Sequence, residues 1–144
     1  MEENLNQIIC ERFGVGDVDV RSYSPLVLAY IGDGIYDLVI RSVVVGKGNT
    51  SPNQLHAHTS HIVKAETQSK MIELLQDELT EEEMNVYRRG RNAKSNTMAK
   101  NASMSDYRNA TGFEALMGYL YLQGQMSRIL ELVQSGLAKA KMTI

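Results

Sequence analysis

The chain has 144 residues and a formal net charge of −2 at pH 7. This length gives about one domain with a single core and little room for an accessory module, so we expect one domain over residues 1–144. Because the overall charge is nearly balanced, a nucleic-acid role would have to rest on a local cluster of Lys and Arg.

The cysteine count and the N-terminal residues bear on the cellular location. Cys10 is the only cysteine, which excludes an intrachain disulfide and a Cys-rich zinc site and favours the reducing cytoplasm. The acidic, polar N-terminus is unlike a secretory signal. Asp33, Asp37 and Arg41 interrupt the apolar run 26–45, which argues against a membrane span. We expect a cytoplasmic protein without a membrane segment.

Helix signals dominate the first half of the chain. A weak helical pattern covers residues 3–13. Serine precedes both prolines, and Ser-Pro is typical of a helix start because serine caps the helix and proline tolerates the first turn. These pairs predict helices from Pro25 to about Val45 and from Pro52 to about Leu75. Gly46 and Gly48 would end the first of them.

The second half of the chain continues this pattern. Thr80 and Glu83 fit a capping box, which predicts a third helix ending near Arg89. Residues 90–105 lack apolar periodicity and predict a loop. Further helices are expected over 107–122 and 126–141, interrupted at Gly124, with Ile129, Leu130, Val133, Leu137 and Ala140 on one face of the last. Since no strand alternation persists, the predicted class is all-α.

Two carboxylates stand in apolar surroundings. The first is Asp33, which shares a stripe of the first long helix with Asp37 one turn further on, and the second is Glu114, the only charge between residues 110 and 127. A buried carboxylate costs several kcal/mol unless it meets a cation or a metal, so these positions suggest a site for something positive. Gly32 and Gly34 beside Asp33 would let a backbone or a ligand approach closely.

Structural alternatives exist for each of these acids. Asp37 could form an ion pair with Arg41, which lies four residues later on the helix. Asp33 could then cap the end of a neighbouring helix. Thr111 and Glu114 also fit a capping box, in which Glu114 would only accept from a backbone amide.

A basic segment follows the third predicted helix. Residues 88–101 contain Arg88, Arg89, Arg91, Lys94 and Lys100, no acid, and short polar side chains such as Asn92. Guanidinium forks, ammonium groups and amide donors together are typical of phosphate binding. The segment holds no aromatic residue, which favours a duplex backbone over stacked single strands. The alternative is a solvated charged loop.

Other catalytic patterns find little support. His56, His58 and His61 do not share a helix face, which disfavours zinc, although they could flank a phosphate near the second Ser-Pro helix start. No Gly-rich phosphate loop and no nucleophile elbow is present.

Three segments together resemble the catalytic domain of the ribonuclease III family, in its short form, Mini-ribonuclease III. They are Pro-Leu-Val-Leu-Ala-Tyr-Ile-Gly-Asp-Gly-Ile-Tyr-Asp (25–37), Arg-Arg-Gly-Arg-Asn-Ala-Lys-Ser (88–95) and Thr-Gly-Phe-Glu-Ala-Leu-Met-Gly-Tyr-Leu-Tyr-Leu (111–122). Their order and separation agree with the family, and the likeness covers nearly the whole chain.

The resemblance implies an all-α homodimer that cuts both strands of double-stranded RNA with Mg²⁺ and leaves 5′-phosphates. It gives metal-binding roles to Asp33 and Glu114, and it implies precursor ribosomal RNA of the large subunit as substrate. Ala29 and Thr111 stand where the full-length enzyme has further acids, which leaves open the metal count and a compensating role for Asp37. We expect no separate double-stranded-RNA-binding domain, so RNA affinity would rest on Arg88, Arg89, Arg91, Asn92, Lys94 and Lys100.

Two other classes of protein remain as alternatives. A catalytically inactive RNA-binding relative would keep the basic segment and lose the acids, whereas Asp33 and Glu114 are both present. A helical interaction protein would explain the apolar helices and leave the acid-free basic segment unexplained.

Overall fold

The computed structural model describes residues 4–94 and 103–144, which fold entirely into helices and connections within those ranges. The helices are α1 (Leu5–Phe13), η1 (Val20–Ser22), α2 (Pro25–Gly46), α3 (Pro52–Val63), α4 (Ala65–Leu75), η2 (Gln76–Glu78), α5 (Glu81–Asn92), α6 (Met104–Leu122) and α7 (Met126–Lys139). The all-α prediction is confirmed, whereas the extent of the domain stays a prediction. No helix in these ranges is long and apolar enough to cross a bilayer.

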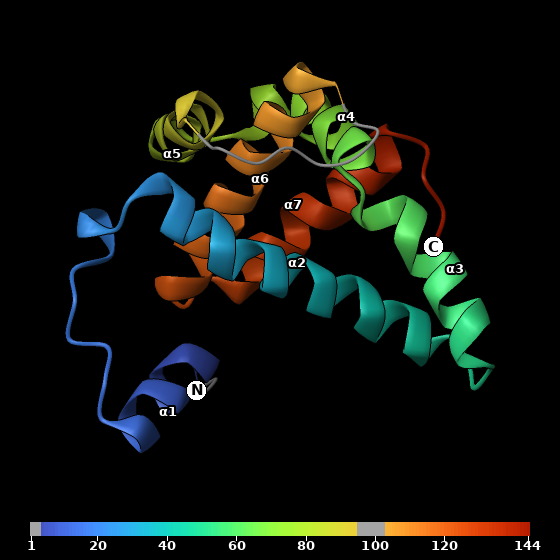
Figure 1. Cartoon of the computed structure of the whole chain (residues 1–144), viewed down its shortest axis with the longest axis horizontal. Helices are drawn as coiled ribbons and strands as arrows, with labels where there is room; N and C mark the ends of the chain where they lie inside the picture. Colours follow the sequence, from blue (N-terminus) through green and yellow to red (C-terminus); the bar gives the residue numbers. More distant parts are fainter. Residues whose placement is uncertain (1–3, 95–102) are drawn as a thin grey trace.

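Helix α6 is the centre of the fold (Figure 1). It contacts α2, α4, α5 and α7, and nearly all of its side chains from Asn109 to Tyr121 are buried. Because apolar residues occur all around α6, neighbouring elements cover it on all sides, and the helix has no amphipathic stripe. Helix α1 buries none of its residues, and its N-cap Asn4 lies against Gly124 in the connection between α6 and α7.

The helix starts predicted from capping residues at Ser24, Ser51 and Thr80 are confirmed. The hydroxyls of Ser24 and Ser51 accept from backbone amides at the beginning of α2 and α3, each followed by proline in the first turn. Thr80 and Glu83 form the reciprocal capping box of α5. Gly124 has φ +74° and separates α6 from α7, as its position in the sequence predicts.

The single helix predicted over 52–75 is wrong. Lys64 adopts an extended conformation and divides it into α3 and α4. Side chains replace the helical amides at the last carbonyls of α3: Thr67 donates to His61 O at 2.6 Å and Gln68 to Val63 O at 2.8 Å. Tyr36 of α2 donates to the carbonyl between them, Ile62 O, at 3.0 Å. Because the C-terminal carbonyls of α3 are satisfied in this way, the break carries little energetic penalty.

The predicted loop over 90–105 is wrong at both ends. Helix α5 continues to Asn92, because Gly90 packs against α6 instead of ending the helix. Helix α6 begins at Met104, three residues before the expected start, with Ser103 as its cap. The last helix ends at Lys139, and its predicted face is buried except for Leu130, which is exposed while Leu132 is buried.

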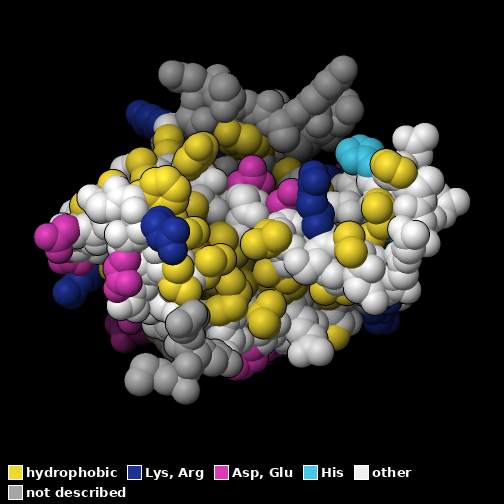
Figure 2. Space-filling view, turned by 90° about the horizontal axis from the view of Figure 1, so that it is seen from below, with side chains coloured by type: hydrophobic (Ala, Val, Ile, Leu, Met, Phe, Trp, Pro, Cys, Tyr) yellow, Lys and Arg dark blue, Asp and Glu magenta, His cyan; other side chains and the backbone are white. Residues whose placement is uncertain are grey.

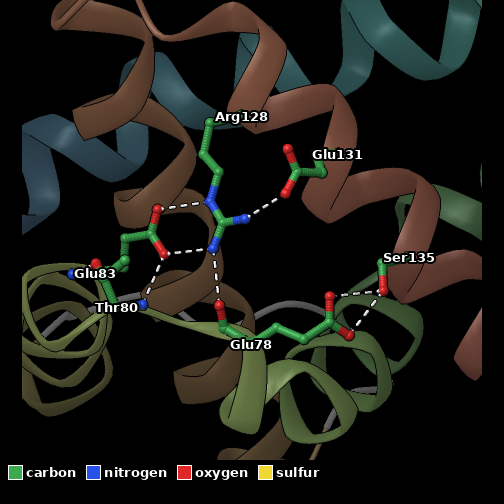
Figure 3. A network of polar contacts seen from close by, with 6 residues as sticks. All are labelled: Glu78, Thr80, Glu83, Arg128, Glu131 and Ser135. Carbon is green, nitrogen blue, oxygen red and sulfur yellow. Dashed lines mark hydrogen bonds and ion pairs between the residues drawn. The ribbon is translucent and has the colours of Figure 1, made fainter.

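A charged network joins η2 and the beginning of α5 to α7 (Figure 3). The Arg128 guanidinium donates to both carboxylate oxygens of Glu83, at 2.9 and 2.8 Å, and to Glu78 O at 2.8 Å. Burial opposes ionisation of Glu83, but the hydrogen bonds from Arg128 and Thr80 outweigh it and hold its pKa below the usual value. This bidentate pair fixes α7 against the start of α5.

We predict that Arg128→Met lowers the free energy of unfolding by about 3 kcal/mol, because it leaves the buried Glu83 carboxylate unpaired. The parent should lose this contribution only when the pH falls below about 4.3, the ordinary pKa of glutamate, since the pKa of Glu83 is lowered in the folded state. Urea denaturation at pH 7 and pH 3.5 measures both effects.

Glu83→Gln added to Arg128→Met is the control, because glutamine removes the charge and still completes the capping box. If the double variant is no more stable than Arg128→Met, an unpaired charge is not the cause.

Candidate active site

Helices α2 and α6 cross with their backbones in contact. A Cβ atom on Gly32 would lie 1.7 Å from the backbone oxygen of Glu114, and one on Gly118 would lie 2.0 Å from the backbone oxygen of Leu28. Only glycine fits at either position. The first of these distances confirms that Gly32 lets another backbone approach closely. A Cβ atom on Gly34, in contrast, would have no atom within 4 Å.

The crossing brings together two of the sequence-predicted site residues. Asp33 is exposed and Glu114 is half-buried. Burial, and then the charge of Asp33 and a hydrogen bond shared with it, raise the pKa of Glu114 to about 8. Two carboxyls that cannot both ionise without cost form a site suited to a cation.

The capping alternatives for these two acids are wrong. Helix α6 begins seven residues before Thr111, whose hydroxyl donates to Tyr107 O inside the helix at 3.0 Å. Glu114 therefore has no helix start to cap. Within residues 4–94 and 103–144, Asp33 caps no helix end.

Gln68 is a neighbour of the pair that sequence analysis missed. It is 2% exposed, and its Nε2 donates to Glu114 Oε2 at 3.3 Å as well as to Val63 O. Its Oε1 is buried without a hydrogen-bond partner. A signal was available in the sequence, because Gln68 lies on the apolar face of α4 with Ile72 and Leu75. A polar side chain on such a face must find hydrogen-bond partners inside the protein.

The other acid on the Asp33 stripe has a structural partner. Asp37 pairs with Arg41 at 2.7 Å, which confirms the ion-pair interpretation. Ala29 and Thr111, where full-length relatives were expected to have acids, are both buried.

The donor set of the pair fits a hard divalent cation. Two carboxylates from different helices meet, and no third His, Cys, Asp or Glu joins them in the described part of the chain. Mg²⁺ is commonly bound by one or two carboxylates, with water and substrate phosphate completing its coordination. The buried, unpartnered Gln68 Oε1 adds a further oxygen nearby.

The helical part of the basic segment, residues 88–92 at the end of α5, packs against α6. A Cβ on Gly90 of α5 would lie 2.7 Å from the Ala115 Cβ and 2.9 Å from the Gly112 Cα, so α5 also crosses α6 in close contact. The end of α5 that carries the arginines is thereby held against the turn of α6 that also carries Glu114.

The individual basic side chains differ in their surroundings. Arg88 and Arg89 are exposed and line a hollow with Asn92 and Pro25, at the start of α2. Arg91 is half-buried, with its guanidinium 5.7 Å from the centre of the Tyr87 ring.

A second hollow extends the basic surface onto α6. Arg91 and Asn92 line it together with Arg108, an exposed residue that sequence analysis did not assign. Lys94 is exposed, and Lys100 lies outside the described residues.

The histidines of α3 do not gather. His56 lines a hollow between α2 and α3 with Arg41, whereas the His61 ring lies 3.4 Å from Ala57 O of its own helix.

Comparison with known proteins decides the family. The profile of the Ribonuclease III domain matches residues 26–125, which include both carboxylates and the basic end of α5. The chain belongs to the ribonuclease III family. It is 50% identical to Mini-ribonuclease 3 of Clostridium tetani over 81% of this chain and 78% of that protein, and 50% identical to Mini-ribonuclease 3 of Brevibacillus brevis over 80% of this chain and 86% of that protein.

A solved structure agrees with this assignment. The crystal structure of a protein from Fusobacterium nucleatum is similar with a TM-score of 0.75 and 30% identity, over 86% of this chain and 98% of that one. The resemblance to Mini-ribonuclease III is confirmed, and this member of the ribonuclease III family is an endoribonuclease.

We predict that Gly32→Ala destabilises this ribonuclease III domain by several kcal/mol, because an added methyl overlaps the backbone of α6 and overpacking of a smaller kind already costs about 1–3 kcal/mol. Gly46→Ala at the end of the same helix is the control, since no atom lies within 4 Å of its Cβ position. Thermal unfolding followed by circular dichroism measures both. Equal melting temperatures for the two variants would contradict the close crossing.

Proposed function

We propose that the chain is a Mg²⁺-dependent endonuclease of double-stranded RNA that acts as a cytoplasmic homodimer in the maturation of large-subunit ribosomal RNA precursor. The observation that carries the proposal is the meeting of Asp33 and Glu114 at the crossing of α2 and α6. Membership of a family that acts on double-stranded RNA, generally with divalent metals, supports it. The ribosomal substrate follows from the likeness to Mini-ribonuclease III, and the cytoplasm from the single cysteine.

Both residues of the pair would serve as ligands of the metal ion. Asp33 and Glu114 would hold the ion through carboxylate oxygens on two helices whose backbones touch, so their separation is fixed before RNA binds. When bound, Mg²⁺ supplies a Lewis acid beside the scissile phosphate. The exposure of Asp33 leaves that side open to a phosphate and to water. No side chain needs to form a covalent bond with the RNA.

We predict that Asp33→Asn and Glu114→Gln each abolish cleavage of a long RNA duplex in Mg²⁺ and leave the domain folded. Each change removes a charged oxygen ligand, and each also removes the repulsion within the pair. In chelator at pH 8 both variants should therefore be at least as stable as the parent. Gel analysis of cleavage, with and without chelator, and melting temperature measure the two effects.

Asp37→Asn is the matched control, because it removes a carboxylate from the same helix whose partner is Arg41. It should retain cleavage. Near-normal turnover of Asp33→Asn or Glu114→Gln would refute the assignment of the pair.

In this proposal the exposed arginines at the end of α5 bind the backbone of the RNA duplex. Arg88 and Arg89 lie near Pro25, and the eight helical steps from Pro25 to Asp33 span about 12 Å along α2. One duplex can therefore contact the arginines through its backbone while a phosphate lies at the carboxylate pair. We assign phosphate binding to Arg88, Arg89, Asn92, Lys94 and Lys100, with Arg108 added and Arg91 shared between RNA and the Tyr87 ring.

We predict that Arg88→Ala with Arg89→Ala weakens duplex binding without unfolding the protein. For each phosphate that the protein no longer neutralises, the dependence of log affinity on log salt should flatten by about one unit or slightly less. Base preference should hardly change, because phosphate contacts position the duplex without identifying bases. Fluorescence anisotropy across a salt series, in Ca²⁺ or chelator, measures the slope.

Lys70→Ala is the control, since it removes an exposed charge from α4. An unchanged affinity and salt slope for the double arginine variant would identify the segment as a solvated surface only.

The proposed homodimer would use the apolar face of α1 and α2. Figure 2 shows hydrophobic side chains gathered on the side where these helices lie. Tyr30 is 83% exposed and Phe13 is 75% exposed, so these two large apolar side chains are not part of the domain's own core. From the sequence we expect the interface chiefly around Tyr30, Ile31, Ile35 and Met117, where apolar helix surface exceeds what one core needs. Ile35 and Met117 are buried in the core instead, and Ile31 is half-buried against it.

We predict a symmetric dimer at micromolar concentration that Tyr30→Glu converts to monomer, because a charge at the centre of an apolar interface stays unpaired. Leu130→Glu is the matched control, since Leu130 is exposed on α7, outside this face. Sedimentation velocity distinguishes the species. A monomeric parent would contradict the homodimer, and a dimeric Tyr30→Glu variant would place the interface elsewhere.

A further inference from the structure

Gln68 connects the carboxylate pair to the break between α3 and α4. Its amide has two hydrogens, and both are used: one on Val63 O at 2.8 Å, the other on Glu114 Oε2 at 3.3 Å. Reversing the amide would place its oxygen against a carbonyl and a carboxylate, two acceptors. The orientation with Nε2 toward Glu114 is therefore set by its partners.

This arrangement leaves Gln68 Oε1 as a buried acceptor without a partner. A buried polar atom of this kind is costly in a native protein unless it has a purpose. Covalent geometry places Oε1 no more than about 2.5 Å from Nε2, and so in the immediate surroundings of Glu114. Mg²⁺ retains several of its waters when it binds to carboxylates, and those waters donate hydrogen bonds.

We propose that Gln68 is the positioning residue of the cation site: its Nε2 orients Glu114, and its Oε1 accepts a hydrogen bond from the hydration shell of the divalent cation. This rests on the function proposed above, because it takes Asp33 and Glu114 as the ligands. The proposed role of Gln68 also explains the break in the helix at Lys64. A continuous helix over 52–75 would not offer Val63 O as the second anchor for the Gln68 amide.

The test is divalent-cation binding without RNA, measured by calorimetric titration of MnCl₂ and MgCl₂ into the parent and the variants. Outer hydrogen-bond partners of metal ligands typically contribute about 10–100-fold to affinity. Gln68→Met, which matches the size of glutamine without its polar atoms, should weaken cation binding by that factor. Gln68→Asn keeps an amide near Val63 O but is one methylene too short to contact Glu114 as well, so it should weaken binding too if the methionine variant does not fold.

Ser69→Ala separates positioning from stability. Ser69 is the buried neighbour of Gln68 and accepts from Asn109, with no contact to Glu114. Its loss should lower the melting temperature in chelator and leave cation affinity unchanged. If Gln68→Met or Gln68→Asn behaves in the same way, Gln68 is only a cap for α3 and the inference is wrong.

The two proposals fail in distinguishable ways. If the parent binds neither ion, or if Asp33→Asn binds as well as the parent, the proposed cation site itself is wrong. If Asp33→Asn abolishes binding while the Gln68 variants keep the parent's affinity, only the role of Gln68 is wrong. Loss of affinity in both sets, with Ser69→Ala unaffected, supports both.

Discussion

The contact between the backbones of α2 and α6 is the constraint on which the site depends. Each glycine inside a helix costs about 1 kcal/mol relative to alanine, and Gly32 and Gly118 are both needed. The two glycines let the helices cross in contact, and the crossing holds the Asp33 and Glu114 carboxyls together. Their mutual repulsion is unfavourable to the fold on its own. These costs in stability are consistent with the cation site proposed for the pair.

Helix α6 carries this constraint to the rest of the molecule. A second glycine crossing, at Gly112 and Gly90, fixes the arginine-bearing end of α5 next to Glu114. The Tyr36 ring packs edge-on against Phe113 at 5.3 Å, and its hydroxyl bonds to the last turn of α3. The α3–α4 break, the carboxylate pair and the basic surface are thus all attached to one buried helix. In the proposed function, catalysis and RNA binding would therefore share one rigid support.

Local signals made much of this predictable. The caps at Ser24, Ser51 and Thr80 depend on neighbours in sequence and were predicted correctly. The isolated carboxylates also stood out in the sequence, and the structure brings Asp33 and Glu114 together, whereas their role as metal ligands stays a prediction. The break at Lys64 and the helical state of Gly90 were missed, because both depend on tertiary contacts, with Tyr36 and with α6. Gln68 was missed for the same reason. The cap interpretation of Glu114 failed because α6 begins earlier than its apolar pattern.

The most direct test of the central claim is a crystal structure of the protein soaked in Mn²⁺, with the ion located by its anomalous scattering. The account predicts a peak coordinated by carboxylate oxygens of both Asp33 and Glu114 at the α2–α6 crossing. A peak bound elsewhere, or an Asp33–Glu114 pair that stays hydrogen-bonded without a peak at saturating Mn²⁺, would contradict it.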